Sequence, residues 1–115
     1  MEAVENEDAT ILRLSGEIDL TNARDVANAL LQEVTDDASG LVAELSGVTY
    51  LDSAGVRLFV DVAERLQRNR QRLALCVPPG SPISRTLSIV KMELLVPVHE
   101  SLDEAVAALT ASDLD

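Results

Sequence analysis

Aromatic residues are nearly absent from this sequence, which has one phenylalanine, one tyrosine and no tryptophan. A hydrophobic core must therefore consist of Leu, Val, Ile and Ala. Apolar residues still make up 47% of the chain, and this content excludes a disordered protein. Aliphatic strands packed under helices suit such a composition. The length of 115 residues predicts a single domain over residues 1–115.

Cysteine and histidine each occur once, as Cys76 and His99. A lone cysteine excludes an internal disulfide, and its apolar neighbours, Leu73 to Val77, predict a buried thiol. No carboxylate cluster has the spacing of metal ligands, and no glycine-rich loop with a following lysine could hold a phosphate. We therefore expect no metal and no cofactor.

A signal peptide is also lacking, and no apolar run approaches the roughly 18 residues of a membrane span. These absences predict a soluble cytoplasmic protein without membrane insertion. The formal net charge of −11 repels phosphate backbones and acidic lipids, so we expect no direct contact with nucleic acid. A basic protein partner is compatible with this charge.

Hydrophobic periodicity predicts alternating strands and helices. The expected strands are 10–14, 41–45, 73–77 and 94–98, and the expected helices begin at Thr21 or Asn22, at Ser53 or Ala54, at Ser81–Pro82 and after a capping box at Ser101–Glu104. Residues 1–8 form an acidic arm or edge strand, and residues 112–115 a frayed tail. Pro97 puts the last strand at an edge. The sequence therefore predicts an α/β fold, with a four- to five-stranded, mostly parallel (mixed) sheet and about four helices.

Two loops follow strands of this sheet, at the edge where functional groups gather in α/β proteins. One holds Asp19 to Thr21, and the other holds Asp52 and Ser53. Glu44 is a carboxylate within an apolar strand, and burying it is costly unless it reaches water or is hydrogen bonded. We expect it at the strand end, pointing to solvent.

Ser53 has three possible uses: a catalytic nucleophile, a helix cap, or a residue that another protein modifies. A nucleophile elbow requires Gly-x-Ser-x-Gly, but Leu51 stands at the first glycine position, and nothing places His99 beside Ser53 as a base. Serine is a favoured helix cap. Phosphorylation is the third use, because a helix amino terminus tolerates the added negative charge. Physical chemistry alone leaves cap and phosphoacceptor both open.

The stretch Leu45–Val56, with Asp52, Ser53 and Gly55 at its centre, resembles the signature of the STAS family of anti-sigma factor antagonists. The stretch Ser15–Thr21 resembles that family's second motif, and together with the final strand and helix the resemblance covers nearly the whole chain. It implies a single STAS-like domain that is not an enzyme. Such a protein binds an anti-sigma factor that is also a serine kinase, and thereby frees a sigma factor.

The same resemblance implies a role for individual residues. Ser53 would be the phosphoacceptor that switches binding off, and a serine phosphatase would reset it. The residues implied in contact with the partner are Asp19, Thr21, Asp52, Ala54, Gly55 and Val56. The sequence departs from the family at Glu44, where aspartate or asparagine is common and a longer side chain alters the pocket beside Ser53, and at Lys91, where many members have glycine.

Two other functions stay open at this point. One is a STAS regulatory subunit of an ABC-type lipid transporter, which shares the junction around Ser53 without needing phosphorylation. The other is a small hydrolase, which would require turnover dependent on Ser53.

Overall fold

The computed structural model describes residues 1–111, so the predicted tail at 112–115 lies outside the described residues. The chain forms β1 (Glu2–Val4), β2 (Thr10–Ile18), α1 (Ala23–Glu33), β3 (Gly40–Leu51), α2 (Ser53–Arg68), β4 (Arg72–Cys76), α3 (Ser84–Ile89), the 3₁₀ turn η1 (Met92–Leu94), β5 (Val98–His99) and α4 (Leu102–Ala111). The five strands form one sheet in the order β1-β2-β3-β4-β5. β1 is antiparallel to β2, and all other neighbours are parallel, which confirms the predicted mixed α/β fold.

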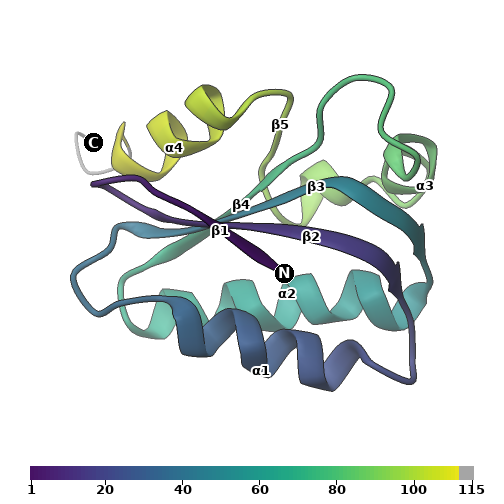
Figure 1. The fold of residues 1–115 in the computed structure, drawn as a ribbon, viewed down its shortest axis with the longest axis horizontal. Helices are drawn as coiled ribbons and strands as arrows, with labels where there is room; N and C mark the ends of the chain where they lie inside the picture. Colours follow the sequence, from purple (N-terminus) through teal and green to yellow (C-terminus); the bar gives the residue numbers. More distant parts are fainter. Residues whose placement is uncertain (112–115) are drawn as a thin grey trace.

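The helices lie in two layers on the sheet. Figure 1 shows α1 and α2 side by side on one face and α4 on the other, with α3 near the end where β2 and β3 finish. Side chains alternate along the central strands, so Leu12 and Ala43 belong to the core under α1 and α2, while Ile11 and Val42 belong to the core under α4. This alternation accounts for the near-continuous apolar run in β3, which is covered on both faces.

Two strands run further than the sequence predicted. β2 continues from Leu14 to Ile18, and β3 continues from Leu45 to Leu51, with register shifts that mark bulges in their pairing. The extension of β3 has exposed residues at 46, 47, 49 and 50 with Val48 and Leu51 buried, so its polar residues had suggested a loop. Both strands therefore end at the same level, directly before the two predicted site loops.

The carboxy-terminal half departs from prediction at two places. The helix expected at Ser81–Pro82 begins at Ser84, because the Ser81 hydroxyl donates to the Pro78 carbonyl (2.6 Å) and holds a turn there. The strand expected over residues 94–98 is reduced to β5, a two-residue strand at the sheet edge. The Pro97 carbonyl still accepts a hydrogen bond from the Leu75 amide of β4 (2.9 Å). The strand order places β5 last in the sheet, which confirms the predicted edge position.

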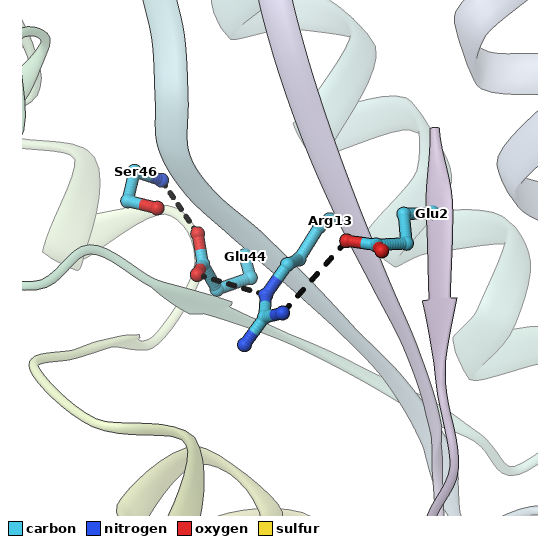
Figure 2. A network of polar contacts seen from close by, with 4 residues as sticks. All are labelled: Glu2, Arg13, Glu44 and Ser46. Atoms are coloured by element: carbon cyan, nitrogen blue, oxygen red, sulfur yellow. Dashed lines mark hydrogen bonds and ion pairs between the residues drawn. The ribbon is translucent and has the colours of Figure 1, made fainter.

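The prediction that Glu44 points to water is wrong, because its side chain is only 8% exposed. Figure 2 shows the reason: Glu44 Oε2 lies 3.4 Å from Arg13 Nε, and Glu44 Oε1 accepts from the Ser46 amide (2.6 Å). Arg13 also reaches Glu2 (3.8 Å), so a row of charges of alternating sign crosses three strands. A cross-strand arginine and a backbone amide offset the cost of burying this carboxylate.

Candidate functional site

The candidate site begins where two parallel strands end together. Ile18, the last residue of β2, is paired with Leu51, the last residue of β3. The Ile18 carbonyl accepts from the Asp52 amide (3.3 Å), which extends the contact one residue past the sheet. The loop after β2 and the start of α2 are thereby brought together, as the sequence predicted for the carboxyl edge of a parallel sheet.

Asp52 joins the two segments through both oxygens of its carboxylate. Its backbone is extended at the N-cap of α2, and Oδ1 accepts from the Gly55 amide (3.0 Å) in the first turn. Oδ2 accepts from the Leu20 amide (3.1 Å) in the neighbouring loop. The interpretation of Ser53 as the cap is therefore wrong: Asp52 is the residue that leaves β3 with a non-helical backbone, and it caps the helix.

Ser53 is the first residue of α2 and is exposed to solvent. Within residues 1–111 its hydroxyl makes no side-chain hydrogen bond to the protein. The amides of Ser53 and Ala54 precede the first hydrogen bond of the helix, which the Val56 amide makes to the Asp52 carbonyl (3.0 Å). Helix starts of this kind leave backbone donors and the positive end of the helix dipole facing outward.

The loop after β2 is held by its own polar side chains. Asp19 Oδ1 accepts from the Thr21 amide (2.9 Å) and the Thr21 hydroxyl (2.5 Å). These bonds, the hydroxyl bond foremost, lower the pKa of the Asp19 carboxyl below its ordinary value, so it is ionised at neutral pH. Asn22 accepts from the Asp19 amide (2.9 Å) and donates to the Glu17 carbonyl (2.8 Å). Asn22 precedes α1 but bonds backward to the loop, so neither it nor Thr21 caps the helix through its side chain.

The residues implied as partner contacts differ in accessibility. Thr21 is exposed, like Ser53, and the others except one are half-buried, namely Asp19, Asp52, Ala54 and Val56. Gly55 is buried: a Cβ there would lie 2.3 Å from Leu51 Cδ1 and 3.1 Å from the Ile18 carbonyl oxygen. Its small size lets α2 start close against the ends of β2 and β3.

The structure adds Leu20, which sequence reasoning did not select. Its side chain is 80% exposed at the tip of the loop, although its amide is bound to Asp52. The sequence placed Leu20 in one of the two site loops, but a single leucine between polar residues gave no sign that its side chain would be exposed there.

His99 and Glu44, the other two residues considered for the chemistry of this site, do not lie beside Ser53. His99 lies in β5 and is paired with Cys76 of β4, and β4 separates it from β3. Glu44 contacts Arg13 and Ser46. It precedes Leu51 by seven positions on β3, so it lies roughly 20 Å along the strand from the site. The suggested effect of Glu44 on a pocket beside Ser53 therefore has no support in this geometry.

No three His, Cys, Asp or Glu side chains within residues 1–111 are arranged to hold a metal ion. The same part of the chain contains no helix with the length and apolar character needed to cross a membrane.

A family model for the STAS domain matches residues 1–105. The chain belongs to the STAS domain family. An anti-sigma-F factor antagonist, RsfB of Mycobacterium tuberculosis, is 25% identical over 105 residues, which are 91% of this STAS chain and 84% of the relative. Among solved structures, an anti-sigma factor antagonist from Mycobacterium paratuberculosis has a TM-score of 0.77 at 23% identity, covering 94% of this chain and 91% of that one. The anti-sigma factor antagonist SpoIIAA, in its unphosphorylated form, has a TM-score of 0.64 at 16% identity, covering 96% of both chains.

Proposed function

We propose that this STAS protein is an anti-sigma factor antagonist controlled by phosphorylation of Ser53. In its unmodified form it binds an anti-sigma factor that is also a serine kinase, and a sigma factor is released. The kinase phosphorylates Ser53 and the complex dissociates, and a serine phosphatase restores the binding form. The protein itself catalyses no reaction in this scheme. The names of the relative and of the two structural neighbours support the role, and one geometric observation supports the residue.

That observation is the free Ser53 hydroxyl on a helix start that a different residue caps. Phosphorylating a capping serine would break the bond that holds the helix end, whereas Asp52 keeps its bonds to Gly55 and Leu20 when Ser53 is modified. The phosphate would meet the outward-facing amides and the helix dipole, which tolerate a dianion. The fold is thus expected to survive the modification unchanged.

The surface, in contrast, would change sharply. The phosphate would add a charge of about −1.5 to −2 beside the carboxylates of Asp52 and Asp19. A partner packed over this edge would have to desolvate that charge without a matching cation, at a cost of several kcal/mol. Since 1.4 kcal/mol is about tenfold in affinity, binding would fall by orders of magnitude. Asp19, Thr21, Ala54 and Val56 would supply the rest of the contact, with Gly55 holding the helix start in place.

The test is phosphate transfer from ATP by the anti-sigma factor kinase of the native host, followed by intact mass. We expect one phosphate on the natural chain and none on Ser53→Ala. Ser88→Ala is the matched control, because Ser88 is also an exposed serine on a helix, and it should accept phosphate normally. Incorporation that persists in Ser53→Ala would contradict the assignment.

Partner binding gives an independent reading. Ser53→Asp should weaken binding to the same anti-sigma factor at least tenfold while the far-UV circular dichroism spectrum stays native. Equal affinity of the natural and Ser53→Asp chains would argue against a charge-based switch.

A further inference from the structure

A groove runs between α1 and α2, starting at the edge of the Ser53 site. Its volume is about 540 Å³. Its apolar lining comes from both helices and from the tip of the preceding loop, and consists of Leu20, Ala23, Ala27, Leu31, Ala54, Leu58 and Val62. The alanines of both helices are small and leave the space between them open. Leu20 lies at the end of the groove nearest Ser53 and is exposed to solvent.

The charge along this groove is opposite to that of the whole chain. Arg24, Arg57 and Arg65 line it, and Asp61 is the only acid in the lining. The chain has 20 acidic residues and only nine basic ones, so a third of its cations gather at this one groove. Arg57 lies 4.0 Å from Asp61, and both side chains are exposed, so this weak contact leaves the charge of Arg57 available to a partner. The guanidinium groups of Arg24 and Arg65 make no salt bridge within residues 1–111.

We propose that the groove between α1 and α2 binds an acidic amphipathic helix of a protein partner. The apolar face of that helix would replace water over the alanines and leucines, and its carboxylates would pair with the arginines. Arg57 and Arg65 are eight residues apart on α2, a rise of about 12 Å, which matches acidic residues two turns apart on a facing helix. Bidentate arginine–carboxylate pairs would fix the register of the partner.

The arrangement also gives the partner a direction. The carboxylates of Asp19 and Asp52 lie next to Leu20, beyond the end of the groove nearest Ser53, and the arginines line the groove itself. A partner that covers both would present basic groups near Ser53 and an acidic helix beyond. Assigning the groove to the same partner that reaches Ser53 rests on the proposed function, but the binding of an acidic helix does not.

The test uses two designed 18-residue helical peptides with leucines at i, i+3, i+4 and i+7, flanked by glutamates in one and by lysines in the other. Each is titrated into the ¹⁵N-labelled chain and followed by amide chemical shifts. We expect the glutamate peptide to shift residues of α1 and α2 that line the groove, and the lysine peptide to leave them unchanged. The double variant Arg57→Glu/Arg65→Glu should lose at least tenfold in affinity for the glutamate peptide and gain binding to the lysine peptide.

The matched control is Arg68→Glu/Arg85→Glu, which changes the net charge equally at exposed arginines outside the groove. This control should bind the glutamate peptide as the natural chain does. Equal binding of both peptides, shifts outside α1 and α2, or no shift at millimolar peptide would overturn the proposal, as would a sedimentation result in which a second copy of the chain occupies the groove. None of these measurements involves phosphate on Ser53, so their failure would leave the phosphorylation switch standing.

Discussion

Asp52 connects the fold to the candidate site through one side chain. One carboxylate oxygen accepts the Gly55 amide of its own helix, and the other accepts the Leu20 amide from a loop more than thirty residues earlier. Serine has one side-chain oxygen, so a serine at this position could not make both bonds with separate oxygens. Asp52, next to the proposed phosphoacceptor, thus stabilises the helix start and the loop, while the Ser53 side chain makes no hydrogen bond that the fold needs.

Because Asp52 makes these hydrogen bonds and Ser53 does not, substitutions at the two positions should lower the free energy of unfolding by different amounts. Asp52→Ala removes the cap and the loop contact, and should lower the free energy of unfolding by about 1–2 kcal/mol. Ser53→Ala removes no hydrogen bond and should change it by less than about 0.5 kcal/mol. Urea unfolding of both variants measures the difference. Asp52→Asn serves as the control that retains a capping oxygen, with an intermediate loss. A Ser53→Ala cost equal to that of Asp52→Ala would restore serine as the cap.

Local sequence could not separate these two residues, because aspartate and serine are equally good caps. The choice depended on where β3 ends, and the exposed Ser46 and Gly47 had suggested an end six residues too early. The prediction that Glu44 points to solvent was wrong for a related reason. Whether its carboxylate is buried depends on Arg13 lying opposite it in the neighbouring strand, and this register comes from the assembled sheet.

At the scale of elements, two helices end in a backbone conformation that usually belongs to glycine. Arg70 after α2 has φ of 61° and Lys91 after α3 has φ of 54°, both in the left-handed region. The resemblance to the STAS family had marked Lys91 as a place where many members have glycine. The geometry explains the preference, since a side chain costs about 1 kcal/mol in this conformation and glycine does not pay it.

Lys91→Gly should therefore raise the free energy of unfolding by about 0.5–1 kcal/mol, which thermal or urea denaturation can measure. Ser88→Gly is a suitable comparison, because Ser88 is an exposed residue with helical backbone in the same short helix. It should lower stability by up to about 1 kcal/mol. The prediction is wrong if both glycine substitutions destabilise the protein.

The order of elements, the parallel sheet and the edge position of β5 were predictable because each rests on local periodicity or on one residue such as Pro97. The two loops of the site could also be placed together, since parallel strands end at one edge. The groove between α1 and α2 could not, because it depends on which faces of two helices meet and on Ala27 and Ala54 lining the space they leave.

At the scale of the whole molecule, the sheet separates two cores of unequal size. The smaller one, under α4, contains Cys76 together with Val42, Ala74 and Ala105. Burial, with the nearby Glu44 carboxylate as the second cause, raises the pKa of the Cys76 thiol from 9.0 to about 11. The thiolate is the form that reacts with alkylating reagents and oxidants. Cys76 in the folded chain should therefore react slowly, because it is buried and because it stays protonated.

Cys76 should therefore report unfolding of the entire domain. Below pH 9 the thiol is protonated in both folded and unfolded chains, so its contribution to stability is constant. Between pH 9 and about 11 only the unfolded chain loses the proton, and stability should fall as pH rises. Urea unfolding from pH 8 to 11, compared with Cys76→Ala, isolates this slope. Iodoacetamide at pH 8 should label the chain only in denaturant, and rapid labelling of the folded chain would contradict the burial.

The free hydroxyl of Ser53 has a consequence for the amount of protein in a cell. If modification breaks no bond of the native state, the modified and unmodified chains unfold equally rarely. Proteases that act on unfolded chains would then remove both at the same rate. The proportion of the two forms would depend on kinase and phosphatase alone, and the total on synthesis and turnover. If Ser53 is phosphorylated as proposed, capping by Asp52 would let the cell change the phosphorylated fraction without changing the total amount of the protein.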